Sequence, residues 1–266
     1  MPRGIFPEVY LKEKMEKITY YLSALADIAL PRCCIVCGRQ LGTRENHLCL
    51  YCAADFPFTR FWSSSRNAMA DRLNLSISRD MESHPEHAGY EKYSYAVALF
   101  FYHGEAPYKK IPQGLKYRKQ FGEGRYFAGL LAEKAFSCRW FSDVDMIIPV
   151  PLHWKRKWER GYNQAEVIAA ELAAEKRCRM QADLLCRGKY TLTQTRLSVE
   201  DKKRNVNSAF HVRENVADRY SPEHIMLVDD VFTTGATMTA CHHALRSFYG
   251  RDIRISAAAL GFVSSD

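Results

Sequence analysis

The chain has 266 residues, of which 47% are hydrophobic and 26% charged, an ordinary balance for a globular protein with one domain plus a small module. No stretch approaches the roughly eighteen consecutive apolar residues of a membrane-spanning helix, so the composition excludes an integral membrane protein and predicts no membrane insertion. The net charge of +8 fits phosphorylated substrates or nucleic acid as partners, and equally a solvated basic surface.

Residues 1–30 are predicted to carry an amphipathic helix over Leu11–Leu30, which Pro31 ends. The apolar face of this helix is formed by Ile18, Leu22, Leu25 and Ala29. Asp27 interrupts the apolar part and no small-residue cleavage site follows it, so the segment does not fit a signal peptide. The expected compartment is therefore the cytoplasm.

Residues 31–57 are predicted to form a zinc-finger module. Two CxxC pairs separated by eleven residues supply four thiols, from Cys34, Cys37, Cys49 and Cys52. Two such pairs complete a tetrahedron around one zinc ion, and Gly38 suits the tight turn of a zinc knuckle. A site with four cysteine ligands has no open position, so the zinc would be structural. A [4Fe–4S] cluster remains an alternative, as does replacement of one ligand by the neighbouring Cys33 or His47.

Residues 58–92 are predicted to be a connector of low regularity, because the segment is heterogeneous and contains a run of serines and a His-Pro pair. A larger domain over residues 93–266 follows. It opens with Tyr93–Tyr102, whose composition is typical of a strand, and continues with helical spacing over Gly124–Phe136.

Strands and helices then alternate to the end of the chain. The predicted buried strands are Met146–Pro151, Ile225–Val228 and Ile253–Val263, with weaker candidates at 184–185 and 209–212. Helices are predicted to begin at Asn163, by a capping-box-like spacing to Glu166, and at Thr237. This alternation predicts an α/β fold in which helices cover both faces of a parallel sheet.

The most informative segment is Ile225–Thr237, where an apolar strand leads into two carboxylates and a threonine-rich turn. The turn comprises Thr233, Thr234, Gly235, Ala236 and Thr237. Unpaired N–H groups and the dipole at the start of a helix favour a bound phosphate there. Asp229 and Asp230 would repel that phosphate, so we expect them to bind sugar hydroxyls or a cation.

This segment resembles the 5-phosphoribosyl-1-pyrophosphate (PRPP) motif of type I phosphoribosyltransferases. The resemblance implies that Asp229 and Asp230 hold the ribose hydroxyls, that Thr233 to Thr237 wrap the 5-phosphate, and that Mg²⁺ accompanies PRPP. It also implies a type I phosphoribosyltransferase-like sheet beside the small zinc module. The alternatives are an αβ-turn capped by threonine, or an inactive site on the same fold.

Other segments are expected at the same edge of the sheet, because ligands bind at the carboxyl ends of parallel strands. The resemblance places pyrophosphate at Pro149, Val150, Pro151 and Leu152. Positive charge follows at Lys155, Arg156, Lys157 and Arg160, which a solvated basic surface would explain equally well. No arginine-rich tail or aromatic-interleaved signature of RNA binding stands out, so composition does not separate the two kinds of partner.

A polar segment, Lys189–Asn207, lies where the family carries a flexible loop that closes over the reacting centre. Closure would exclude water from an activated sugar that is prone to hydrolysis. Within this loop we take Arg204 as the catalytic cation that would stabilise departing pyrophosphate. Solvated loop charges are the simpler alternative for Lys202, Lys203 and Arg204.

The whole pattern is similar to the ComF/GntX family, a narrower resemblance that covers about Ala24 to Phe262. The features that carry it are the two CxxC pairs, Arg160-Gly161-Tyr162-Asn163-Gln164, Gln194, Leu197, Arg204, Asn205 and Phe210. It implies a zinc finger fused to a phosphoribosyltransferase-like domain with a role in bacterial DNA uptake. The implied partners are PRPP, single-stranded DNA and a competence helicase.

Three functions are consistent with these patterns. The chain could be an active phosphoribosyltransferase with an unknown acceptor, a non-catalytic single-stranded-DNA-binding or adaptor protein on the same fold, or a sensor that binds PRPP without turnover. Any hood that selects an acceptor must come from the N-terminal half, through the zinc module or residues 116–119. The motif therefore indicates a donor and leaves the acceptor open.

Overall fold

The computed structural model describes residues 31–83, 92–117, 121–188, 210–217 and 221–264. The predicted helix over Leu11–Leu30 and the Lys189–Asn207 loop with Arg204 lie outside these residues. The chain divides into two compact units, Met1–Phe56 and Pro57–Asp266, and each is described by itself. In the described ranges, no helix has the length and apolar character needed to cross a bilayer.

The described part of the first unit is built from tight turns around a small apolar centre. The Cys34 N–H donates to the Arg39 carbonyl at 2.8 Å, and the Gly38 N–H donates back to the Cys34 carbonyl at 2.9 Å. Gly38 has a φ of 77°, which glycine adopts without the steric cost of a side chain. The short helix α2 (Leu50–Ala54) begins directly after Cys49. The buried apolar side chains of this unit include Val36, Leu41, Leu48 and Phe56.

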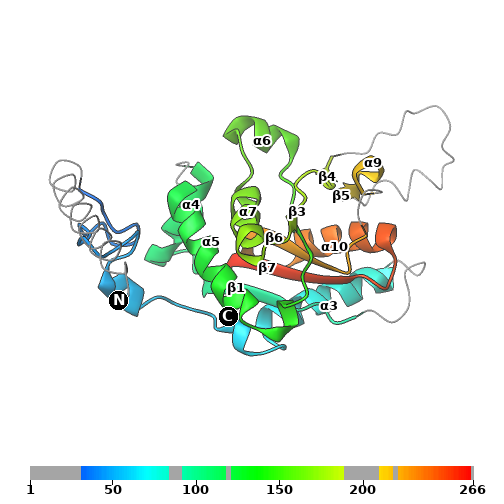
Figure 1. The fold of residues 1–266 in the computed structure, drawn as a ribbon, viewed down its shortest axis with the longest axis horizontal. Helices are drawn as coiled ribbons and strands as arrows, with labels where there is room; N and C mark the ends of the chain where they lie inside the picture. The colour runs from blue at the N-terminus through cyan, green and yellow to red at the C-terminus, as the bar shows by residue number, and fades with distance from the viewer. Residues whose placement is uncertain (1–30, 84–91, 118–120, 189–209, 218–220, 265–266) are drawn as a thin grey trace, which may run out of the picture. The chain divides into compact units, whose positions relative to one another are not determined.

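The second unit is organised by a five-stranded sheet with the order β1-β7-β6-β2-β3, in which every neighbouring pair is parallel (Figure 1). Its strands are β1 (Ala96–Phe101), β2 (Met146–Pro149), β3 (Arg179–Met180), β6 (His224–Phe232) and β7 (Arg254–Phe262). Strands β1, β2 and β7 are almost entirely buried, as expected where helices cover both faces of a parallel sheet.

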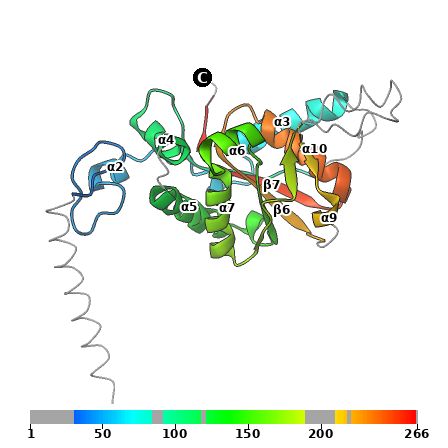
Figure 2. The same cartoon turned by 90° about the horizontal axis from the view of Figure 1, so that it is seen from above.

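Helices cover the two faces of this sheet in pairs, as Figure 2 shows. One face carries α3 (Ala68–Ser83) and α10 (Ala236–Tyr249), which pack against each other. The other face carries α5 (Phe121–Phe136) and α7 (Gln164–Lys176), which also pack against each other. The predicted α/β fold, a parallel sheet between two layers of helices, is confirmed.

Shorter elements connect these layers. They are η1 (Phe61–Ser63), η3 (Pro107–Lys109), α4 (Lys110–Tyr117), η4 (Arg139–Phe141), α6 (Trp154–Arg160), β4 (Leu185–Arg187), β5 (Phe210–Val212) and α9 (Glu214–Ala217). The two weaker strand candidates are confirmed as β4 and β5, which form a separate antiparallel pair.

The prediction that residues 58–92 lack regular structure is wrong for Ala68–Ser83, which form the sixteen-residue helix α3. Asn67 caps this helix, because its Oδ1 accepts the N–H groups of Met69 and Ala70 at 3.1 and 3.0 Å. Met69, Leu73 and Ile77 repeat at four-residue intervals and are buried, so one face of α3 anchors it to the second unit.

Strand β6 is longer than the predicted Ile225–Val228, and this difference positions the acid pair. Its neighbour β2 ends at Pro149, which is paired with Val228, whereas pairing with β7 continues to Phe232. Asp229 and Asp230 therefore lie inside the strand, just beyond the end of β2, instead of in the turn that follows.

A polar cluster of the buried His224 and Ser256 with the exposed Asp143 joins the strands at the opposite, amino edge of the sheet. The His224 Nδ1 lies 2.8 Å from Asp143 Oδ1, and its Nε2 lies 3.0 Å from Ser256 Oγ. Burial lowers the pKa of His224 to about 4, although the charge of Asp145 acts in the opposite direction. The neutral ring thus donates from Nδ1 to the carboxylate and accepts the Ser256 hydroxyl at Nε2. This pairing satisfies the polar groups where β6 and β7 begin.

Candidate functional site

The acid pair forms the centre of the site at the carboxyl edge of the sheet. Asp230 is buried, and Asp229 is half-buried. Asp229 Oδ1 accepts the Asp230 N–H at 2.8 Å, which holds the first carboxylate against the strand. Burial raises the pKa of Asp229, and the charge of Asp230 raises it further. A cation or a set of hydroxyl donors would offset this unfavourable accumulation of charge.

The turn after β6 presents polar groups at the start of α10. Thr233, Thr234 and Ala236 are exposed, and the backbone reverses at Gly235 with a φ of 87°. A Cβ atom at Gly235 would lie 2.9 Å from the Phe232 ring, so both the φ and the space favour glycine. The first N–H groups of α10, a fourteen-residue helix, have no intrahelical partner and can bind an anion.

Arg72 of α3 forms a hydrogen bond with this turn, a contact that the sequence did not predict. Its Nη1 donates to the carbonyls of Thr233 and Val263, at 2.8 and 2.6 Å. Its guanidinium also lies 4.6 Å from the centre of the Phe262 ring. Arg72 thereby ties the carbonyl of Thr233, at the start of the turn, to α3 and to the residue that follows β7.

The expected pyrophosphate segment, Pro149 to Leu152, continues from the end of β2 beside the acid pair. The Val150 N–H donates to the Val228 carbonyl at 2.8 Å, and the Val150 carbonyl accepts from Asn163 Nδ2 at 3.0 Å. Pro149 and Pro151 have no N–H, so the first three residues offer no N–H to an anion. An anion here would depend on Leu152 and on the basic side chains of α6.

Helix α6 displays aromatic and basic side chains together, which the sequence interpretation missed. Trp154 and Trp158 are 68% and 83% exposed and lie one helical turn apart, so they share a face. The exposed basic residues between them are Lys155, Arg156 and Lys157. Arg160 lies over the ring of Tyr117, which is itself 71% exposed, with 5.4 Å between its guanidinium carbon and the ring centre. Glu159 is exposed on the same helix, and Lys157 forms an ion pair with Glu166 at 2.8 Å. We call Trp154–Arg160 with Tyr117 the aromatic-basic face.

Lys116 of α4 also reaches the acid pair. Its Nζ lies 2.8 Å from Asp230 Oδ2. The structure therefore brings together the carboxylates, the Thr233–Thr237 turn, the Pro149–Leu152 segment and a lysine that the sequence did not predict. Arg204, the predicted loop cation, lies outside the described residues.

The four cysteines of the two CxxC pairs converge in the first unit. The Sγ atoms of Cys34, Cys37, Cys49 and Cys52 all lie within 4.8 Å of one another. Four ligands at the Zn–S distance of about 2.3 Å would place sulfurs about 3.8 Å apart. The Cys37 and Cys49 sulfurs are 3.7 Å apart, so this cluster could hold a metal ion such as zinc. Cys33 and His47 are not part of the cluster.

Burial raises the pKa of Cys34, but backbone N–H groups of Cys37, Cys49 and Val36 outweigh it and lower the value to about 7. The pKa of Cys52 is instead raised, first by burial and then by hydrogen bonds with the other thiols. A thiolate at Cys34 is thus favoured, and metal binding would remove the proton that Cys52 retains.

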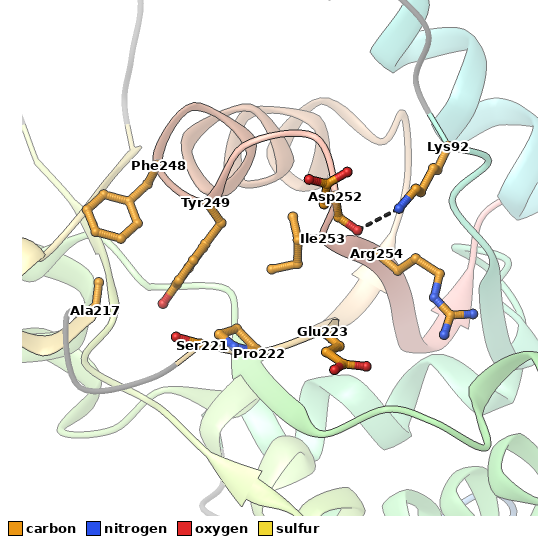
Figure 3. A pocket seen from close by; sticks show the side chains of 10 residues that line it. All are labelled: Lys92, Ala217, Ser221, Pro222, Glu223, Phe248, Tyr249, Asp252, Ile253 and Arg254. Atoms are coloured by element: carbon orange, nitrogen blue, oxygen red, sulfur yellow. Dashed lines mark hydrogen bonds between the residues drawn. The ribbon is translucent and has the colours of Figure 1, made fainter.

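A separate hollow of about 740 Å³ lies at the amino edge of the sheet, opposite the acid pair (Figure 3). Its charged lining residues are balanced in sign: Lys92, Glu223, Asp252 and Arg254. The Lys92 ammonium donates to the Asp252 carbonyl at 2.6 Å, and Arg254 forms an ion pair with Asp143. The lining therefore carries two positive and two negative side chains, with no excess of positive charge.

No protein-family model matches the chain. The chain is 27% identical to competence protein F of Haemophilus influenzae over 228 residues, which cover 84% of this chain and 94% of that protein. It is 39% identical to the DNA utilization protein YhgH of Escherichia coli O6:H1 over 94 residues, 35% of this chain and 40% of that protein. The YhgH of Salmonella typhi is 31% identical over 135 residues, 50% of this chain and 58% of that protein.

Among solved structures, the chain aligns with the adenine phosphoribosyl transferase of Trypanosoma brucei in complex with AMP, pyrophosphate and ribose-5-phosphate. That alignment has a TM-score of 0.30 and 13% identity, and covers 59% of this chain and 70% of the other. A likeness this weak carries no argument about the site. The resemblance to the ComF/GntX family is confirmed instead by competence protein F, which matches most of the chain at the level of sequence.

Proposed function

We propose that the carboxyl edge of the sheet binds PRPP together with Mg²⁺. The observation that carries this proposal is the acid pair at the end of β6, followed within three residues by the exposed turn that opens α10. Asp229 and Asp230 would accept the ribose hydroxyls, and the N–H groups of the Thr233–Thr237 turn would bind the 5-phosphate. Mg²⁺ would neutralise part of the negative charge of the pyrophosphate and of the two carboxylates beside the ribose.

The reaction that this geometry would support is displacement of pyrophosphate from C1 of the ribose. The C1–O bond to pyrophosphate would break while a bond forms to the acceptor, and the pyrophosphate would leave with both electrons of the broken bond. The protein would contribute mainly positioning and electrostatic stabilisation. Release of pyrophosphate in the presence of candidate bases or amines separates this enzyme from a sensor, which would bind PRPP without releasing pyrophosphate.

Replacing either acid should weaken PRPP binding. In isothermal titration with Mg²⁺, Asp229→Asn and Asp230→Asn should each raise the Kd at least about tenfold, since a hydrogen bond to a charged group contributes about 1.5–3 kcal/mol. Asp252→Asn is the matched control, because it removes one carboxylate at the opposite edge of the sheet. Absence of binding by the wild type over a range of salt, or an equal loss in the control, would contradict the proposal.

We also propose that the aromatic-basic face binds single-stranded DNA. Bases stack on exposed aromatic rings while neighbouring cations neutralise the phosphates, and α6 with Tyr117 offers both. The relatives named for competence and for DNA utilization support a role of this chain in the uptake or use of DNA. The acid pair and the aromatic-basic face are formed by different side chains, so variants of each can test the two proposals separately.

Loss of an exposed tryptophan should weaken DNA binding. Trp158→Ala should raise the Kd for fluorescein-labelled oligo-dT at least about fivefold in anisotropy titrations, since stacking contributes about 1–3 kcal/mol per base. Trp158→Phe should retain most of the affinity. Leu75→Ala, which removes an exposed apolar side chain from α3, serves as the control. If the wild type does not bind the oligonucleotide at low salt, or if Leu75→Ala loses as much affinity as Trp158→Ala, the aromatic-basic face is not the DNA-binding site.

We propose that the cysteine cluster holds a structural zinc ion. Purified protein should contain about one zinc per chain by mass spectrometry, and Cys34→Ser should lose it because three thiolates no longer complete the tetrahedron. Limited proteolysis should then cut between residues 31 and 56, since metal binding contributes directly to the folding of such modules. Cys33→Ser should keep the zinc. Retention of full zinc by Cys34→Ser would argue against the assigned ligand set.

A further inference from the structure

Lys116 places a positive charge at the centre of the carboxyl-edge site. Its Nζ lies 2.8 Å from Asp230 Oδ2, and the side chains of Lys116 and Asp230 are 28% and 10% exposed. The more buried carboxylate of the pair thus already has a cationic partner from the chain itself. That partner comes from α4, which follows β1 and so reaches the site from a different part of the sequence.

The acid pair needs such a partner when no ligand is bound. Two consecutive carboxylates repel each other, and the strand carrying them is largely buried. The charge of Lys116 opposes the effects of burial and of Asp230 on the pKa of Asp229. Lys116 therefore helps to keep the pair ionised. Its ammonium occupies the place beside Asp230 that a bound metal cation would otherwise take.

The backbone of α4 near Lys116 is fixed. The Tyr162 hydroxyl donates to the Leu115 carbonyl, and the Tyr162 and Phe121 rings meet edge to face at 4.8 Å. A Cβ atom at Gly124 would approach Leu115 Cδ1 to 2.6 Å, so α5 packs tightly against the same turn. A lysine side chain, in contrast, is a flexible four-carbon stem. Movement of the ammonium away from Asp230 then requires only new side-chain rotamers.

We propose that Lys116 is an internal counter-ion of the acid pair, and that a divalent cation or the ribose hydroxyls of the ligand must displace its ammonium from Asp230. This inference rests on the proposed PRPP site and adds a residue that sets its affinity. The lysine stabilises the ligand-free protein and competes with the ligand for the same carboxylate oxygen. Ligand affinity is therefore lower than the carboxylates alone would provide.

The test compares two lysine variants of α4 with the same change in charge. Lys116→Gln removes the ammonium but keeps an amide donor for Asp230, and Lys110→Gln removes an exposed charge from the start of the same helix. In titrations with PRPP and Mg²⁺ at pH 8, Lys116→Gln should bind at least about fivefold more tightly than Lys110→Gln, the lower end of typical coupling between sites. Thermal melting by circular dichroism establishes that both variants are folded.

A titration with Mn²⁺ alone, followed by electron paramagnetic resonance, gives a second measurement that does not depend on PRPP. Lys116→Gln should again bind more tightly than Lys110→Gln. Equal or weaker binding of both ligands by Lys116→Gln overturns the counter-ion role. If neither the wild type nor the variants bind PRPP, the proposed function is wrong, and the Mn²⁺ titration tests the counter-ion role by itself. Tighter Mn²⁺ binding by Lys116→Gln than by Lys110→Gln supports that role, and equal binding contradicts it.

Discussion

The site depends on the unequal lengths of two parallel neighbours, β2 and β6. Because β2 ends opposite Val228, the last four residues of β6 pair only with β7 on one side. Asp229 and Asp230 occupy that stretch, close to the turn that begins α10. A longer β2 would cover the acid pair with backbone, and a shorter β6 would place the carboxylates in the turn. The end of β2 at its proline therefore sets where a ligand can bind.

The charged side chains at the two edges of the sheet differ in how they are paired. At the amino edge, His224, Asp143 and Ser256 satisfy one another, and Arg254 pairs with Asp143. At the carboxyl edge, the turn at Gly235 keeps donors exposed, and the acid pair is balanced by a lysine from a distant helix. Internal pairs such as those at the amino edge contribute to folding, whereas an edge with exposed donors and a displaceable counter-ion can exchange those contacts for a ligand. This contrast is why we assign function to the carboxyl edge and not to the hollow at the amino edge.

Sequence alone predicted the features that depend on local pattern. Continuous apolar runs located the central strands, and the spacing of the CxxC pairs predicted the four sulfurs that the structure brings together. Asn67 and the four-residue apolar repeat indicate helix α3, but the serine run before it and the His-Pro pair after it are typical of irregular structure and led to the wrong prediction. Trp154 and Trp158 were recognisable as an exposed pair only once α6 was known to be a helix without buried residues. The ion pair of Lys116 with Asp230 joins residues far apart in sequence, and no local pattern encodes such a contact.

The most direct test of the account is a crystal structure of the protein with PRPP and Mg²⁺. The account predicts the 5-phosphate at the N–H groups of the Thr233–Thr237 turn, the ribose hydroxyls on Asp229 and Asp230, and the Lys116 ammonium displaced from Asp230. Ligand density in the hollow at the amino edge, with none at the turn, would contradict it. So would an unaltered Lys116–Asp230 ion pair beside a fully bound ribose.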